Sequence, residues 1–372
     1  MNRFTILHTI ETAGPGGAET VLYQLAAKLD RNRFRSVVLL PRGGWLSERL
    51  EEAGISVYFV DSNHWYDFRV PRAMHELIRR ERIDLIHSHL PTQNFYSCLA
   101  GSLAGRKTVV TYHGAIELDH SGGWKETIRL AGVRHLADAV VVVCNYVGRL
   151  LLEARFSPEK IIRIYNGINI DRFRVTAPGR LRRELNLPAD TRLVGCVANL
   201  RESKGHAFLI QSARMVIDRY PDTHFVAVGD IDPDIGRPLF ALVNELQLWD
   251  RFHFLGFRRD VPEILGELDV FVLPSMSEGF PLVALEAMAA GRPVVATQCG
   301  GPAEVVEDGI TGRIIPPGDA DAIAGAVMEL LANRELAAVL ARRGQAKVES
   351  AFTLEKMVGE YETLYQRLLE AV

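Results

Sequence analysis

The sequence of 372 residues has few cysteines and contains no long apolar segment. The four cysteines are widely spaced, at Cys98, Cys144, Cys196 and Cys299. Because the sequence contains no Cys-x-x-Cys pair or His/Cys cluster, it argues against a zinc site and favours buried, reduced thiols. The longest apolar run, residues 137–144, is interrupted by Asp138 and is too short to cross a bilayer. The N-terminus lacks the pattern of a signal peptide, so we expect a soluble or peripheral protein.

The sequence also lacks a strong charge of either sign. It has 43 Lys and Arg against 46 Asp and Glu, a formal net charge of -3. A general nucleic-acid binder needs clustered basic residues to meet phosphate groups, so we expect no nucleic-acid partner. One basic stretch, Arg79-Arg80-Glu81-Arg82, remains compatible with an anionic membrane surface.

Short apolar runs rich in β-branched residues alternate with amphipathic helical segments, and this alternation occurs twice. The strands predicted for the first half are residues 4–10, 36–40, 57–60, 85–87, 108–112 and 139–143. Those predicted for the second half are residues 193–198, 224–228, 251–254, 270–273 and 294–296. Continuous apolar character is typical of parallel strands covered by helices on both faces. We therefore predict an α/β protein with two Rossmann-like, doubly wound domains, 1–170 and 171–352, followed by a helix within 353–372.

The strongest motif runs from Glu278 to Glu286 and directly follows a predicted strand. Gly279 permits close backbone approach, and Pro281 stands where the first helical position is expected. The N–H groups that begin this helix, at Leu282 and beyond, form a ready anion site. An acidic first turn that complements the helix dipole would explain Glu278 alone, but not the whole loop. Two acceptors flanking an anion site suit a diphosphate that joins two hydroxylated sugars.

A second motif, Leu200-Arg201-Glu-Ser-Lys204-Gly205, follows the predicted strand 193–198. Two cations in a strand-to-helix loop can neutralise a diphosphate, and Gly205 again allows close approach. Solvated loop charge is the alternative interpretation of this motif.

These motifs occur together with several others in a fixed order along the chain. The others are Gly16-Gly17-Ala18-Glu19, Thr111-Tyr112-His113-Gly114, Asn166-Gly167-Ile168, Asp171 and Phe173, and a closing segment with Phe352-Thr353, Tyr361 and Tyr365. The set resembles the retaining GT-B glycosyltransferases of family 4 (glycosyl transferases group 1). The resemblance implies two Rossmann-like domains facing across a cleft, with a C-terminal helix that crosses back to the N-terminal domain.

The resemblance implies three catalytic residues. Lys204 would hold the donor diphosphate and stabilise the leaving group, Glu278 would contact the donor sugar hydroxyls, and His113 would lie near the reacting centre. Glu286 would bind the nucleotide ribose. The other donor-binding residues implied are Gly16, Gly17, Asn199, Arg201, Phe257, Arg258, Gly279, Phe280, Pro281 and Leu282. The chain departs from the family at Asn199, where an Arg is usual, and we expect Arg201 to substitute for it.

Charge grows on the departing diphosphate in such a reaction, so cations and helix N–H groups should supply most of the catalysis. The resemblance implies retention without a protein nucleophile. We expect no cofactor and no bound metal, because Asp230-Ile231-Asp232 is the nearest match to a metal-binding DxD triplet and reads as a polar loop. We expect His8, His87 and His89 to be structural.

Acceptor contacts are expected from loops of the N-terminal half. Residues 63–68 form an aromatic stretch suited to sugar stacking, to a membrane interface or to packing on its own domain. Segment 124–135 carries Lys125, Arg129 and Arg134 beside apolar residues. It could lie on an anionic leaflet or be an ordinary crossover helix.

We therefore expect a glycosyltransferase that moves a hexose from a nucleotide sugar to a saccharide or lipid-linked acceptor. A UDP-sugar is favoured as donor, with GDP-mannose as the alternative. The expected setting is bacterial surface polysaccharide or glycolipid synthesis, in the cytoplasm and peripherally on the inner membrane face. Two other interpretations stay open: a sugar-nucleotide epimerase of the same architecture, and a non-catalytic nucleotide-sugar binding protein.

Overall fold

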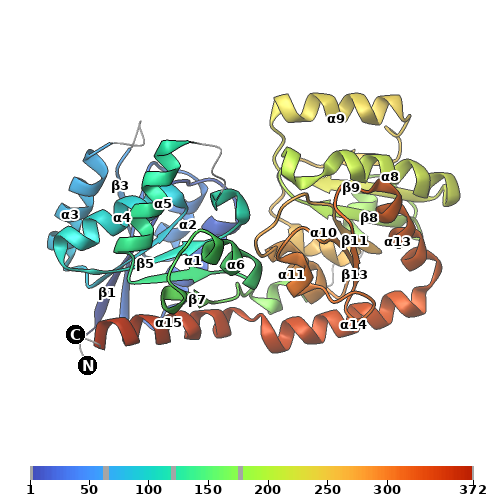
Figure 1. The fold of residues 1–372 in the computed structure, drawn as a ribbon. Helices are drawn as coiled ribbons and strands as arrows, with labels where there is room; N and C mark the ends of the chain where they lie inside the picture. Colours follow the sequence, from blue (N-terminus) through green and yellow to red (C-terminus); the bar gives the residue numbers. More distant parts are fainter. Residues whose placement is uncertain (1–2, 62–66, 119–122, 175–178, 371–372) are drawn as a thin grey trace. The chain divides into compact units, whose positions relative to one another are not determined.

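The computed structural model describes residues 3–61, 67–118, 123–174 and 179–370 (Figure 1). The chain forms two compact units. The first consists of Met1–Asn166 and Leu354–Val372, and the second of Gly167–Thr353. The sequence predicts the ends of the first two domains a few residues away, at 170 and 352.

The first unit is built on a parallel sheet with the strand order β3-β2-β1-β4-β5-β6-β7. Its strands are β1 (Phe4–Ile10), β2 (Phe34–Leu40), β3 (Ser56–Phe59), β4 (Leu85–His89), β5 (Lys107–Tyr112), β6 (Ala139–Val142) and β7 (Ile161–Arg163). Its helices are α1 (Gly17–Lys28), α2 (Trp45–Glu52), α3 (Arg69–Glu81), α4 (Pro91–Ala104), η1 (Ala115–Leu118), α5 (Trp124–Leu136), α6 (Asn145–Glu153), η3 (Pro158–Lys160) and α15 (Leu354–Glu370).

Strand β2 shows why this sheet needs a helix layer on each face. Val37 and Leu39 pack with the buried residues of α3 and α4. Val38 and Leu40 point the other way and pack with residues of α1 and α2. Successive side chains of a strand point to opposite faces, so an unbroken apolar run buries both faces at once.

The second unit repeats this plan with the parallel strand order β10-β9-β8-β11-β12-β13. Its strands are β8 (Arg192–Val197), β9 (Thr223–Val228), β10 (Phe252–Phe254), β11 (Val270–Leu273), β12 (Val294–Thr297) and β13 (Arg313–Ile315). Its helices are η4 (Ile170–Phe173), α7 (Arg180–Glu184), η5 (Glu202–Lys204), α8 (His206–Arg219), α9 (Pro233–Glu245), α10 (Val261–Glu267), α11 (Leu282–Ala289), α12 (Pro302–Val305), α13 (Ala320–Ala332) and α14 (Arg334–Ala351).

The sequence missed the two sheet-edge strands β7 and β13. Each has three residues, includes an arginine and buries at most one side chain, so neither carries the continuous apolar signal of a central strand. Helix α15 belongs to the first unit (Figure 1). Its Tyr361 and Tyr365 side chains are fully buried. Across the described ranges, no helix has both the length and the apolar character needed to cross a membrane.

Candidate active site

The loop after β8 presents Lys204 because Gly205 allows two backbones to touch. Gly205 adopts a left-handed conformation with φ of +68° and precedes α8. A Cβ on Gly205 would lie 2.0 Å from the carbonyl oxygen of Pro274, which no side chain tolerates. The glycine therefore presses the Lys204 loop against the chain segment that follows the neighbouring strand β11.

A hydrogen bond joins the same two loops directly. The Met276 N–H donates to the Ser203 carbonyl oxygen at 2.8 Å. Lys204 Nζ then donates to Glu278 Oε1 at 2.7 Å, and Ser275 Oγ donates to the same oxygen, also at 2.7 Å. The structure thus brings together the lysine and the glutamate singled out from the sequence. Ser275 lies in the same loop but outside the motifs found in the sequence.

A second close approach fixes the backbone on the far side of Glu278. Glu278 forms an isolated β-bridge with Gly300, and a Cβ on Gly301 would lie 1.4 Å from the Gly279 carbonyl oxygen. Thr297, at the end of β12, donates its hydroxyl to the Ser275 carbonyl oxygen at 2.5 Å. Gly301 lies outside the motifs found in the sequence. The Gly300-Gly301-Pro302 sequence after strand β12 was the available signal.

Helix α11 begins immediately after this loop, with one difference from the prediction. Pro281 is the residue before the helix, with φ -78° and ψ 101°, and Leu282 is the first helical residue. Pro281 has no N–H, so backbone donors at this end must come from its neighbours. Phe280 is buried and packs edge-on against Phe352, with 5.3 Å between ring centroids. The ring of Phe280 is therefore occupied by packing, and only its backbone is placed to contact a ligand.

Glu286 lies a little over one turn into α11 and is only partly exposed. Burial raises the pKa of its carboxyl to about 7, and the nearby Arg172 guanidinium opposes that rise. A carboxyl with its pKa near neutrality changes charge easily when a ligand offers hydrogen bonds.

Two of the implied donor residues have partners within the protein. Asn199 Oδ1 accepts from the Asp230 N–H at 3.0 Å and so ties the loop after β8 to the loop after β9. Arg258 donates to Asp260 Oδ2 at 2.7 Å and to Glu184 Oε2 at 2.9 Å, and these carboxylates raise its pKa. Both residues therefore hold loops together in this structure.

The other implied residues of this region lie at the surface. Arg201 is exposed, and Phe257 is 45% exposed. In the Asp230-Ile231-Asp232 segment, the Asp232 carboxylate accepts from the Asp234 N–H at 2.9 Å and caps α9.

In the first unit, His113 follows β5 and is held at two points. Its Nε2 lies 2.8 Å from His89 Nδ1, and its backbone N–H donates to Glu117 Oε1 at 2.7 Å. Burial lowers the pKa of His113 to about 3 and raises the pKa of Glu117 to about 8. Glu117 went unnoticed in the sequence because it lies in a short 3-10 turn outside any motif.

The glycine pair after β1 opens α1. Gly16 precedes the helix, and a Cβ there would lie 2.3 Å from Glu19 Oε2. Glu19 Oε1 in turn accepts from Thr12 Oγ1 at 2.6 Å. Gly17 is the first helical residue, and a Cβ added there would meet no described atom within 4 Å. A Cβ at position 16 would thus displace the end of the Glu19 side chain, whereas one at position 17 would enter open space among the described residues.

The segments expected near the acceptor differ in what the structure describes. Residues 63–66 of the aromatic stretch lie outside the described residues, whereas Phe68 is 75% exposed. In α5, Trp124 and Ile128 are 63% and 46% exposed. Arg129 is turned inward, because it donates to Thr92 Oγ1 at 2.9 Å and pairs with Glu126. The Arg129 guanidinium is therefore engaged within the protein in this structure.

Two known families match this chain in succession. The family described as Glycosyltransferase Family 4 matches residues 15–172, and Glycosyl transferases group 1 matches residues 179–347. The chain is 29% identical over 323 residues to the N-acetyl-alpha-D-glucosaminyl L-malate synthase of Bacillus anthracis, covering 86% of this chain and 84% of the relative. It is 26% identical over 367 residues to the UDP-Gal:alpha-D-GlcNAc-diphosphoundecaprenol alpha-1,3-galactosyltransferase of Escherichia coli, covering 94% and 93%.

Solved structures agree with these matches. Anabaena Alr3699/HepE in complex with UDP and glucose superposes with a TM-score of 0.89 at 25% identity, covering 98% of this chain and 100% of that one. A glycosyltransferase from Rickettsia africae ESF-5 shares the fold, with a TM-score of 0.86 at 23% identity and 100% coverage of both chains. The predicted fold and the resemblance are both confirmed. The chain belongs to the family 4 (group 1) glycosyltransferases and has the GT-B fold.

Proposed function

We propose that this glycosyltransferase moves a hexose from a UDP-sugar to a saccharide or lipid-linked acceptor, with retention and without a metal ion. The observation that carries this proposal is the 2.7 Å contact between Lys204 and Glu278 beside the start of α11. The E. coli relative is named for UDP-Gal and a lipid diphosphate, and Anabaena Alr3699/HepE was solved with UDP-glucose. These names support a UDP-sugar over GDP-mannose, and a role in surface polysaccharide or glycolipid synthesis.

Donor binding would exchange one charged contact for several. The Lys204 ammonium, which Glu278 neutralises here, would turn to the diphosphate. The Glu278 carboxylate would accept hydrogen bonds from the hexose hydroxyls instead. The N–H groups at the start of α11, at Leu282 and Val283, add positive potential for the phosphates. Lys204 and Glu278 would then both contact the donor, so neither charge would be left without a partner.

Catalysis would be mainly electrostatic. As the bond from sugar to phosphate breaks, negative charge grows on the diphosphate, so the Lys204 ammonium and the helix N–H groups bind the transition state more strongly than the ground state. Lys204 would thus supply the charge that a metal ion supplies elsewhere. We place His113 at the reacting sugar, and Glu286 at the ribose hydroxyls, where its carboxyl would accept hydrogen bonds.

The test is binding measured by calorimetry and thermal shift with a panel of UDP-, GDP- and ADP-sugars. A ligand that binds the folded state raises the melting temperature, so the preferred nucleotide identifies itself. At a fixed ligand concentration Lys204→Met should strongly reduce the shift, while Lys28→Met, which removes an exposed lysine of α1, should keep it. An unchanged response in Lys204→Met would show that the donor binds elsewhere.

Enzymes of other classes give different products from the same donor. We expect transfer activity that requires an acceptor and does not increase when Mg²⁺ or Mn²⁺ is added. Conversion of a UDP-hexose to its epimer without any acceptor would instead support the epimerase. Binding without turnover, over a panel of lipid diphosphate and saccharide acceptors, would support the non-catalytic alternative.

Helix α5 supports a peripheral membrane contact as part of this proposal. Trp124 and Ile128 lie four residues apart, on one side of the helix, and both are exposed. An exposed tryptophan beside an aliphatic side chain and Lys125 fits the interface of an anionic leaflet, where a lipid-linked acceptor would lie.

A further inference from the structure

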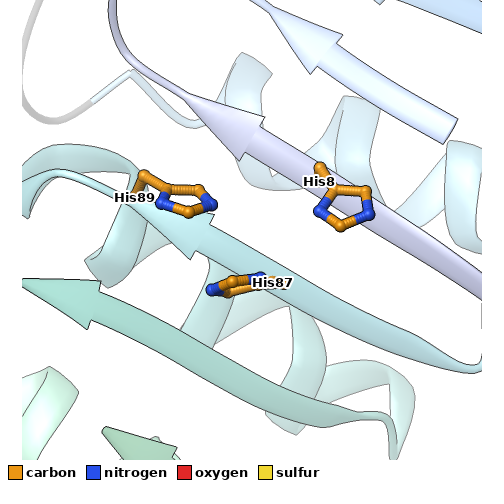
Figure 2. Close-up of side chains that lie close together, drawn as sticks. All are labelled: His8, His87 and His89. Atoms are coloured by element: carbon orange, nitrogen blue, oxygen red, sulfur yellow. The ribbon is translucent and has the colours of Figure 1, made fainter. Parts of the chain in front are cut away.

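Three histidines meet inside the first unit, on one face of its sheet. His8 of β1 is the cross-strand partner of His87 in β4, and His89 follows two residues later on the same face. Figure 2 shows the three rings grouped over these adjacent strands. One nitrogen of each ring lies within 4.8 Å of one nitrogen of each of the others. All three side chains are completely buried.

Much of the hydrogen-bonding capacity of these rings is unused. Within the described part of the chain, both ring nitrogens of His8 and the Nε2 of His89 have no hydrogen-bond partner. Buried polar atoms are normally paired, because an unpaired one loses its hydration without compensation. Several unpaired ring nitrogens in one place indicate a site where a bound group would supply the missing partners.

The remaining nitrogens are held in the way that metal-binding histidines usually are. His89 Nδ1 lies 2.8 Å from His113 Nε2, and His87 Nδ1 lies 2.6 Å from the Tyr365 hydroxyl. Histidine ligands generally hydrogen-bond through the nitrogen that does not bind the metal, which fixes the ring. His87 Nε2 also lies 2.7 Å from Thr111 Oγ1, so His87 must release one of its two hydroxyl partners to bind an ion.

Burial also keeps these rings in the form that binds metals. It lowers the pKa of His8 to about 3 and the pKa values of His87 and His89 well below the usual range. Neutral imidazole has a lone pair for a metal ion and is a preferred ligand of Zn²⁺, Cu²⁺ and Ni²⁺.

We propose that His8, His87 and His89 form a structural site for a divalent transition-metal ion, Zn²⁺ in the cell, that ties β1 to β4. Bonds of about 2.0–2.1 Å at tetrahedral angles bring nitrogens to roughly 3.4 Å, so the rings close in by small side-chain rotations. A water molecule completes the fourth position. The ion holds His89 and, through the His89–His113 contact, the loop after β5. This site is separate from the donor residues of the second unit and leaves their metal-free chemistry unchanged.

The experiment uses the full chain without a histidine tag, stripped with EDTA and titrated with Zn²⁺ and Co²⁺. Metal content by mass spectrometry and the visible spectrum of tetrahedral Co²⁺ report binding, and the melting temperature reports its effect on stability. The proposal expects about one ion per chain and a raised melting temperature. His8→Gln removes a ligand and should weaken binding by more than the roughly tenfold that loss of a ligand's hydrogen-bond partner costs.

His253→Gln is the matched control. His253 also contacts a histidine, with its Nε2 2.9 Å from His224 Nδ1, but it lies in the second unit. Metal binding should be unchanged in this variant. If His8→Gln does not fold, the Co²⁺ spectrum of the wild-type chain decides, because three imidazoles and a water give a tetrahedral spectrum. Wild-type protein that binds no stoichiometric ion, or equal binding in folded His8→Gln, overturns the site.

Discussion

The ammonium nitrogen of Lys204 lies 2.7 Å from a carboxylate oxygen of Glu278, although 74 positions separate the two residues. The contact exists because β8 and β11 are neighbouring parallel strands, whose following loops meet at one edge of the sheet. The Lys204 ammonium, a cation for phosphates, is thereby hydrogen-bonded to the Glu278 carboxylate, an acceptor for sugar hydroxyls.

The separate roles of Lys204 and Glu278 can be tested by comparing the binding of UDP with that of a UDP-sugar. Lys204→Met should weaken both UDP and the UDP-sugar by roughly 10- to 150-fold, as expected for loss of a charged hydrogen bond of about 1.5–3 kcal/mol. Glu278→Gln should weaken only the UDP-sugar, because UDP has no hexose hydroxyls. Calorimetric dissociation constants for both ligands check this, and equal losses for UDP and UDP-sugar in Glu278→Gln would contradict the assigned role.

Gly301→Ala should damage the same site through the backbone. Its new methyl group would meet the Gly279 carbonyl oxygen at 1.4 Å, so the loop that carries Glu278 must move. We expect a loss of about 2 kcal/mol or more in the free energy of unfolding, and weaker UDP-sugar binding. Denaturant unfolding and calorimetry measure the two effects.

Gly325→Ala is the control for this substitution. Gly325 lies within α13, and no described atom lies within 4 Å of an added Cβ. Alanine should stabilise this helix by about 0.5–1 kcal/mol and leave binding intact. Comparable damage in both variants would show that Gly301 has no special place at the site.

Glu286 predicts proton release when the donor binds. The pKa of its carboxyl is about 7 because of burial, and hydrogen bonds from ribose hydroxyls favour the ionised form and lower that pKa. At pH 7 a fraction of a proton should therefore leave, and affinity should rise with pH from 6 to 8. Calorimetry in buffers of different ionisation enthalpy measures the release. The effect should vanish in Glu286→Gln, and its persistence there would assign the proton to another group.

Buried His206 predicts a loss of stability in acid. Burial, reinforced by the Lys204 ammonium, lowers its pKa to about 4, whereas an unfolded histidine titrates near 6.5. The unfolded chain therefore binds the proton first. Stability should fall as the pH drops below about 6.5 and level off near 4, by about 3 kcal/mol from this residue. Urea unfolding from pH 7 to 4 should show a smaller fall in His206→Met, and an identical fall would contradict this.

Helix α5 predicts binding to anionic vesicles. Trp124→Ala combined with Ile128→Ser should reduce sedimentation with vesicles of an anionic phospholipid, because both side chains are exposed apolar groups. Trp249→Ala removes a tryptophan of similar exposure from the second unit and serves as the control. Vesicle binding that is equal in all three proteins would argue against a membrane contact through α5.

The sequence by itself determined the two parallel sheets and the loops that carry Lys204 and Glu278. Unbroken apolar runs record burial on both faces of a strand, and glycine or proline beside charged residues marks the loop after it; both signals are local. The edge strands β7 and β13 escaped because each has only three residues, one of them an arginine, and so leaves no such run.

Tertiary structure alone decided which side chains of the site meet. The resemblance implies Arg258 as a donor-binding residue, and the structure adds that Glu184 and Asp260 hold its side chain. The approach of Gly301 to Gly279 and the grouping of His8 with His87 likewise join residues from different strands. Such contacts depend on strand order, register and side-chain packing across the sheet, which no local pattern of residues records.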